Sequence, residues 1–153
     1  MHPDLFDLCW QYRRFLEPRW FLLHQSWGDT STEKLSKYMC RYTSIFVKTV
    51  LNVDNQASWR LVAGRPVTKE KEGTNKGCFG FRTSSGIFFD HCWVQLDNLI
   101  VDITADQFGA EEVIITSASD CRYYPNLEEE DFSKDIAKLS HHPERWLQEW
   151  NDK

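Results

Sequence analysis

The chain is 153 residues long, 41% hydrophobic and 14% aromatic, with seven tryptophans and ten phenylalanines. This apolar content suffices for one folded domain with a substantial core and argues against a largely disordered chain. The net charge of −5 and the absence of a long basic run disfavour a nucleic-acid-binding protein. No stretch approaches the ~18 consecutive apolar residues that indicate a membrane-spanning helix.

The cysteines are odd in number and include no pair with CxxC spacing: Cys9, Cys40, Cys78, Cys92 and Cys121. A disulfide framework or a zinc knuckle is therefore not expected. The N-terminal sequence contains acidic residues and no cleavable signal pattern. We expect a cytoplasmic protein, with export by a route that needs no signal peptide left open. The sequence carries no sign of an oligomeric state.

The first third of the chain is expected to be largely helical. Apolar residues recur at helical spacing over residues 3–23, and Pro18 is expected to end or kink that helix. Residues 24–35 resemble a loop, because glycine and small polar residues interrupt the pattern. Apolar residues on one face of residues 36–52 then predict a second, buried helix.

The rest of the chain is expected to be mostly β structure with a helical end. Residues 58–67 predict a short strand, and the charged, glycine-containing residues 68–77 predict a surface loop. Residues 78–109 predict antiparallel strands, residues 111–119 a further strand, and residues 131–153 helix. This order predicts an α+β fold, with N-terminal helices packed on an antiparallel β-sheet and a C-terminal helix, in one domain over the whole chain.

Three residues of this layout can form a reactive centre. Cys40 lies in the first turns of the second predicted helix, whereas His91 and Asp102 lie on the two strands of a predicted hairpin. With a turn at Asp97 and Asn98, residues whose numbers sum to about 195 face each other. His91 and Asp102 then share a face as diagonal neighbours. Asp102 can accept a hydrogen bond from one imidazole nitrogen, which leaves the other to face a thiol.

The thiol of Cys40 needs activation, because a free cysteine with a pKa of ~8.5 is mostly protonated at neutral pH. A helix N-terminus and a nearby imidazolium both favour the thiolate. A helix that begins at Ser36 or Lys37 would place Cys40 near its N-terminus, whereas one that begins at Thr32 would place it mid-helix; the sequence leaves both open. Taken singly, such residues are usually structural, and only their combination favours a Cys-His-Asp centre.

Three stretches resemble the transglutaminase-like branch of the papain-like cysteine-peptidase superfamily: YMCRYTSIFVKTVL, WRLVAG and DHCWVQLDNLIVDITADQFG. The resemblance covers residues 36–109. That family has a nucleophilic cysteine at a helix start, a histidine strand of the form H-x-W-V, and an aspartate in a V-D-x-T context. Met39 and Arg41 stand here where the family has small residues.

The resemblance implies a papain-like core and a thiol hydrolase or acyltransferase. By this resemblance, Cys40 is the nucleophile, His91 the general base and acid, and Asp102 the residue that orients the imidazole. The implied reaction is acyl transfer through a thioester on a protein or peptide substrate, without a cofactor or metal. Hydrolysis by a peptidase or protein glutamine deamidase is favoured over transamidation, because no acyl-acceptor site can be recognised. The backbone N–H of Cys40, with Gln25 and Trp27 in the preceding loop, is a candidate oxyanion or substrate contact.

Two other classes remain as alternatives. The chain can be a catalytically inactive papain-like scaffold that acts as a protein-interaction module, or a zinc enzyme that uses His91 and nearby cysteines. The HHPE sequence lacks the spacing of a zinc motif. Cys92 is expected to face away from His91 into the core, because neighbouring strand residues alternate. Asp106 and Gln107 either line a substrate channel or form a turn, and the turn is favoured.

Overall fold

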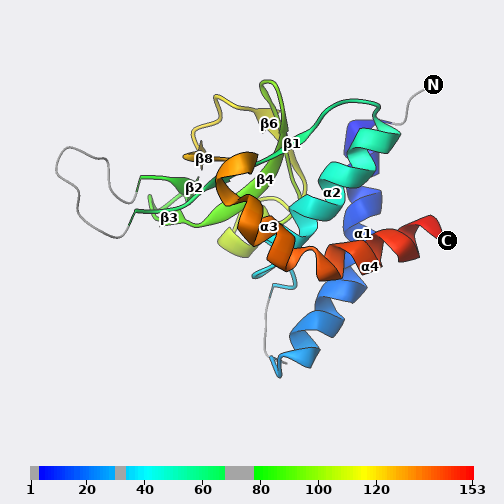
Figure 1. The fold of residues 1–153 in the computed structure, drawn as a ribbon. Coiled ribbons are helices and arrows are strands. Elements are labelled where there is room, and N and C mark those ends of the chain that lie inside the picture. Colours follow the sequence, from blue (N-terminus) through cyan, green and yellow to red (C-terminus); the bar gives the residue numbers. More distant parts are fainter. Residues whose placement is uncertain (1–3, 30–33, 68–77) are drawn as a thin grey trace.

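A computed structural model describes residues 4–29, 34–67 and 78–153, and it confirms the α+β class (Figure 1). The described helices are α1 (Leu5–Ser26), α2 (Cys40–Asp54), α3 (Ser133–Leu139) and α4 (His141–Asn151), with 3-10 turns η1 (Ala105–Phe108) and η2 (Glu129–Phe132). The described strands are β1 (Arg60–Gly64), β2 (Gly80–Arg82), β3 (Phe88–Phe89), β4 (His91–Leu96), β5 (Leu99–Asp102), β6 (Ile114–Ser117), β7 (Tyr123–Tyr124) and β8 (Leu127–Glu128).

The described strands form two antiparallel sheets. One has the order β6-β5-β4-β1-β8 and the other the order β3-β2-β7. Figure 1 shows α1, α2 and α4 gathered on one side of the sheets, with α2 (cyan) packed against β4. Within the described ranges, none of the helices combines the length and apolar character that crossing a bilayer requires. The charged loop predicted at residues 68–77 lies outside the described residues.

Helix α1 continues through Pro18 to Ser26, so the prediction that Pro18 ends the helix is wrong. A proline inside a helix costs about 3 kcal/mol, because it loses one backbone hydrogen bond and its ring meets the preceding turn. Leu16, Trp20 and Leu23 are buried on both sides of Pro18, and each such side chain contributes about 1.5–3 kcal/mol on burial. Their packing offsets the proline, and the predicted loop starts only after Ser26.

Helix α2 begins at Cys40 itself, later than any of the starts at Thr32, Ser36 or Lys37 that were considered from the sequence. Tyr38 adopts the left-handed backbone conformation, with φ of +68°, which no residue inside a right-handed helix can keep. The residues before it form turns, in which Met39 N–H donates to the carbonyl of Ser36. Cys40 therefore occupies the first helical position, at the positive end of the helix dipole.

The hairpin of β4 and β5 has the predicted register. Val94 pairs with Val101 and Leu96 with Leu99, so paired residue numbers sum to 195 as expected. Asp97, in the turn, has φ of +50°, in keeping with the positive φ that tight hairpin turns require. This register is what brings the start of β4 and the end of β5 to the same edge of the hairpin.

The two sheets meet where two glycines approach each other. A Cβ atom on Gly64 of β1 would collide with the backbone of Gly80 and with the carbonyl of Tyr124. Gly80 has φ of +114°, and a Cβ atom there would collide with the carbonyl of Phe89. Only glycine permits this approach, which sets the position of β7 relative to the first sheet.

Arg13 of α1 ties the segment after β5 to the helical layer. Its guanidinium is buried and donates to both carboxylate oxygens of Asp106, at 2.7 and 3.0 Å. It also donates to the carbonyls of Ile103 at 2.8 Å and Glu112 at 3.1 Å. A buried charge must be compensated by such contacts, so Arg13 acts as a clamp on residues 103–112.

We predict that Arg13→Met lowers the free energy of unfolding by roughly 3–5 kcal/mol, because it leaves the Asp106 carboxylate buried without its partner. Urea denaturation followed by tryptophan fluorescence measures this change. Arg14→Met is the matched control on the exposed face of α1 and is expected to change stability by no more than about 0.5 kcal/mol. Equal effects from the two variants would contradict a clamping role for Arg13.

Candidate active site

His91 and Asp102 form a buried pair at the open end of the hairpin. His91 is the first residue of β4 and Asp102 the last of β5. The Nε2 atom of His91 lies 2.7 Å from Oδ2 of Asp102, and the two side chains are 0% and 1% exposed. The diagonal contact predicted from the sequence is therefore confirmed in its geometry.

Asp102 is held by three further hydrogen bonds. Its Oδ1 accepts from the backbone N–H of Thr104 at 3.1 Å and from the Thr104 hydroxyl at 3.4 Å. Its Oδ2 accepts from the hydroxyl of Tyr123, which comes from the second sheet, at 2.8 Å. Burial alone would raise the pKa of Asp102, but the charge and hydrogen bond of His91, with those of Thr104 and Tyr123, hold this pKa below its usual value. Asp102 is thus a carboxylate in a fixed orientation.

The interactions around His91 favour the protonated form of its imidazole. Burial would lower the pKa of His91, but the charge of Asp102 and its hydrogen bond to the ring outweigh this effect and raise the pKa to about 10. The nearby thiol of Cys40 also raises the pKa. Because Nε2 contacts Asp102, Nδ1 is the ring nitrogen that remains available to the thiol. Within the described residues, Nδ1 has no hydrogen-bond partner.

Aromatic rings enclose the imidazole. Phe81, Trp93 and Phe108 pack around His91, with ring centroids 5.7, 6.1 and 5.0 Å away. These rings exclude water from the His91–Asp102 pair, so that its electrostatic interaction is little screened. The ring is thereby fixed in position as well as in charge.

Cys40 connects this buried pair to a pocket. The thiol lies at the start of α2 and lines a cavity of ≈ 530 Å³, a volume within the usual range for ligand sites. It lies at the helix N-terminus and beside the imidazole of His91. The backbone N–H of Cys40 is among the first four of the helix, which have no intrahelical acceptor and can donate to a ligand.

The two upstream candidates from the sequence fall in different places. Trp27 lies at the end of α1 and lines the pocket of Cys40 as expected. Gln25 is not among the residues that line it, so the described structure gives no support to its predicted role as an oxyanion contact. The reason is the continuation of α1 to Ser26, which keeps Gln25 on an exposed part of the helix and not in a loop.

Gln107, which follows β5, lines the pocket that Gln25 does not reach. It lies in η1, so the predicted turn is present, but its side chain also lines the pocket. Its Oε1 accepts from the backbone N–H of Tyr38 at 3.3 Å, and its Nε2 donates to the carbonyl of Thr104 at 2.9 Å. An amide nitrogen carries two hydrogens, so Nε2 retains one donor. Its neighbour Asp106 instead points to Arg13.

An ion pair joins the neighbours of Cys40 and His91. Arg41 donates to Oδ1 of Asp90 at 3.2 Å, and Arg65 donates to Oδ2 of the same carboxylate at 3.2 Å. Both Arg41 and Asp90 line the pocket. The pair links the start of α2 to the start of β4, the two elements whose relative position sets the distance between sulfur and imidazole.

Sequence reasoning missed two contributors, Tyr123 and the Arg41–Asp90 pair. Tyr123 belongs to a two-residue strand of the other sheet, and no local pattern links it to Asp102. The ion pair had a usable signal, because residues of opposite charge directly follow Cys40 and directly precede His91. The sequence also points to Gln107, because this residue lies in the turn that follows the strand of Asp102.

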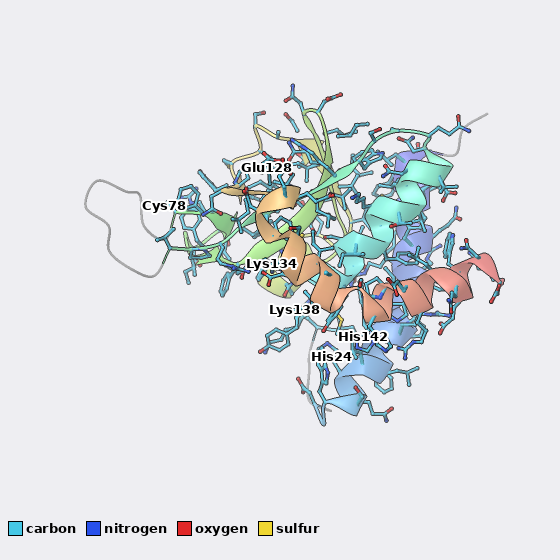
Figure 2. All side chains as sticks on the ribbon, viewed as in Figure 1. His24, Cys78, Glu128, Lys134, Lys138 and His142 are labelled. Carbon is cyan, nitrogen blue, oxygen red and sulfur yellow. The ribbon has the colours of Figure 1, made fainter. Side chains whose placement is uncertain are left out.

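The other described cysteines and histidines do not form a second centre. Cys92 is buried in the core as predicted, and burial raises the pKa of its thiol well above the usual value. Cys78, at the left of Figure 2, is exposed and lies far from α2, and Cys121 is also exposed. His142, labelled beside α4 in Figure 2, stacks on Trp146. Within the described ranges, no three histidine, cysteine or acidic residues are placed to hold a metal ion.

Comparisons of the chain with protein-family models, with curated proteins and with solved structures found no match. The resemblance to the transglutaminase-like branch therefore stays a prediction. Its support is the sequence motifs together with the geometry of Cys40, His91 and Asp102.

We predict that the His91 ring stays protonated from pH 6 to pH 9, and that Asp102→Asn leaves it neutral at pH 7, because burial then outweighs the remaining interactions. The ring-nitrogen NMR shifts report both states. In the wild type, the stabilisation from His91 is complete below its unfolded pKa of about 6.5 and is lost as the pH rises through about 10.

Asp90→Asn is the matched control, because it removes a carboxylate that is next to His91 in the chain but points to Arg41 and Arg65. The His91 ring is expected to remain protonated at pH 7 in this variant. A wild-type ring that loses its proton below pH 8 would contradict the proposed charge state.

Proposed function

We propose that this chain is a cysteine-dependent amide hydrolase that works through a thioester on Cys40, with His91 and Asp102 completing the triad. One observation carries the proposal: a thiol at a helix N-terminus lies close to an imidazole whose Nε2 atom is 2.7 Å from a buried carboxylate. The same thiol lines a pocket large enough for a substrate. Nucleophile, base and orienting residue in this order form the arrangement that acyl transfer requires.

In the first half of the reaction, the Cys40 thiolate attacks the carbonyl carbon of the substrate amide and forms a carbon–sulfur bond. The carbonyl electrons move to the oxygen, which becomes an oxyanion. The carbon–nitrogen bond then breaks, and His91 gives its Nδ1 proton to the departing nitrogen, so that an amine or ammonia leaves. The products of this half are a thioester on Cys40 and a neutral imidazole.

In the second half, neutral His91 takes a proton from water, and the resulting hydroxide attacks the thioester carbonyl. The carbon–sulfur bond breaks, the carboxylic acid leaves, and the thiolate–imidazolium pair is restored. Asp102 keeps the ring oriented and stabilises its positive charge throughout, as its hydrogen bonds from Thr104 and Tyr123 allow.

The oxyanion is expected to receive two donors, the backbone N–H of Cys40 and the remaining N–H of Gln107. Both groups border the same pocket, and the hydrogen bond from Tyr38 to Gln107 holds the amide beside the start of α2. Donors that are already in place are worth more than mobile ones, because no reorganisation is needed when charge develops.

The fold supports a papain-like or transglutaminase-like core. The helix that begins with the nucleophile packs on the antiparallel strand that carries the histidine, and the aspartate follows on the next strand. A protein or peptide is the proposed substrate. The competing proposal is an inactive scaffold of the same fold that binds a protein partner, and the labelling experiment below separates the two.

We predict that iodoacetamide at pH 6 labels Cys40 before Cys78 and Cys121. Accessibility alone would give the opposite order, because Cys40 is 9% exposed and the other two are exposed. Only a thiolate fraction raised by the site can reverse it. Peptide mass spectrometry after limited alkylation measures the order.

His91→Gln is the matched variant, since it keeps a polar side chain without the positive charge. Cys40 is then expected to react more slowly than Cys121. If wild-type Cys40 already reacts more slowly than both exposed cysteines, the scaffold becomes the better proposal.

We predict that Gln107→Leu lowers kcat for hydrolysis of p-nitrophenyl acetate by roughly 100- to 1,000-fold, because one oxyanion donor is lost. Its alkylation by iodoacetamide, which develops no oxyanion, should stay unchanged. Gln25→Leu is the matched control, and its kcat is expected to equal that of the wild type. A Gln107→Leu enzyme with normal kcat would remove this residue from the mechanism.

The natural reaction is tested by mass spectrometry of protein and peptide mixtures treated with the wild type and with Cys40→Ala. Deamidation gives a mass gain of roughly one dalton on glutamine, and peptidase action gives new termini. Either change must be absent with Cys40→Ala.

A further inference from the structure

The pocket beside Cys40 is lined mainly by apolar side chains. Its walls include Trp27, Tyr38, Tyr42, Phe89, Phe108 and Leu139. These residues come from α1, the turn before α2, α2 itself, β3, η1 and α3, so six separate segments converge on one apolar surface. A concave site of this composition favours an apolar group in its ligand.

Three of these aromatic residues remain substantially exposed at the pocket. Trp27 is 47% exposed, Tyr38 62% and Phe89 42%. Tyr38 has a left-handed backbone conformation. Such a conformation costs free energy and is found often at functional sites. Exposed aromatic residues that gather at one hollow mark a binding surface, whereas single ones carry no such meaning.

The charges in the pocket compensate each other. Among the described lining residues, Arg41 and Asp90 are the charged ones, and they are paired at 3.2 Å. Asp90 also pairs with Arg65, and Arg65 in turn lies 3.7 Å from Asp135. A basic or acidic substrate side chain would have to displace one of these partners, so the pocket has no surplus charge with which to select it.

A second hollow of ≈ 540 Å³ adjoins the first and shares Tyr38, Phe89, Gln107 and Phe108 with it. Ile87, which is 53% exposed, also lines this second hollow, together with Lys37 and the hydroxyl-bearing residues Thr83, Ser84 and Ser85. Cys40 lines the first hollow and not the second. Because the two hollows share four residues, an extended chain bound beside Cys40 can place one side chain in each.

We infer that the substrate is an extended peptide with a large apolar side chain, aromatic or branched aliphatic, within one residue of the carbonyl that Cys40 attacks. This inference rests on the proposed function and narrows it to peptide-bond cleavage after an apolar residue. The Cys40 thiolate forms a bond to the backbone carbonyl carbon, the peptide C–N bond breaks, and the released amine takes the proton of His91. Water then hydrolyses the thioester.

The test uses dipeptide chloromethyl ketones, which alkylate an active-site cysteine with loss of chloride. The series is acetyl-Phe-Gly, acetyl-Gly-Phe, acetyl-Gly-Gly, and the matching probes with lysine or aspartate. The second-order rate of Cys40 alkylation is measured by intact mass and divided by the rate with iodoacetamide. At least one phenylalanine probe is expected to react roughly 10- to 100-fold faster than acetyl-Gly-Gly, and the charged probes no faster than acetyl-Gly-Gly.

Leu139→Lys is the variant that tests the pocket, because it places a charge in the apolar wall at the end of α3, where the helix dipole tolerates lysine. It should reduce the phenylalanine preference, taken relative to the iodoacetamide rate of the same variant, severalfold. Leu22→Lys is the matched control on the exposed face of α1, outside this pocket, and it should change neither rate.

The outcomes separate this inference from the proposed function. Selective iodoacetamide labelling of Cys40 without a phenylalanine preference, or a preference that survives Leu139→Lys, overturns the inference and leaves the enzyme proposal in place. A faster reaction with a chloroketone built on the side-chain carbonyl of glutamine also overturns it and favours a deamidase. If iodoacetamide does not label Cys40 ahead of Cys121, both proposals fail.

Discussion

The contact between His91 and Asp102 is the interaction on which the rest of this site depends. Two opposite charges are removed from water here, and several kcal/mol per ion must be recovered from their mutual attraction and from further hydrogen bonds. The chain supplies those bonds to Asp102 from Thr104 and Tyr123. The surrounding aromatic rings keep water out, so the attraction between the two groups is strong. The site therefore consists of a fixed charge pair with the thiol of Cys40 close to the imidazole of His91.

One local and two longer-range constraints give this pair its position. The hairpin register brings the two residues together, the Arg13 clamp holds the segment that follows Asp102, and the close approach of Gly64 and Gly80 sets the second sheet against the first. The clamp and the glycine contact join different elements of the fold. The site thus rests on the whole α+β arrangement, and local strand geometry alone would leave the carboxylate without the hydrogen bond from Tyr123.

Local patterns predicted the parts of the fold that follow from local physics. The period of two in the strands and the turn at Asp97 were sufficient for the hairpin and for the His91–Asp102 contact. The end of the first helix was missed because packing of Leu16, Trp20 and Leu23 overrides the local effect of Pro18. That error placed Gln25 in a loop, whereas Gln107 was already named as a residue that lines a channel or forms a turn. Tyr123 was beyond reach for a different reason, since nothing near it in the sequence indicates which carboxylate it contacts.

The hydrogen bond from Tyr123 to Asp102 bears on when the site is completed as the chain is synthesised. During synthesis, Cys40, His91 and Asp102 emerge before residue 123, and Asp102 lacks the hydrogen bond from Tyr123 until β2 and β7 have docked on the first sheet. Under the proposed function, the orientation of the triad would therefore be complete only in a fully folded chain.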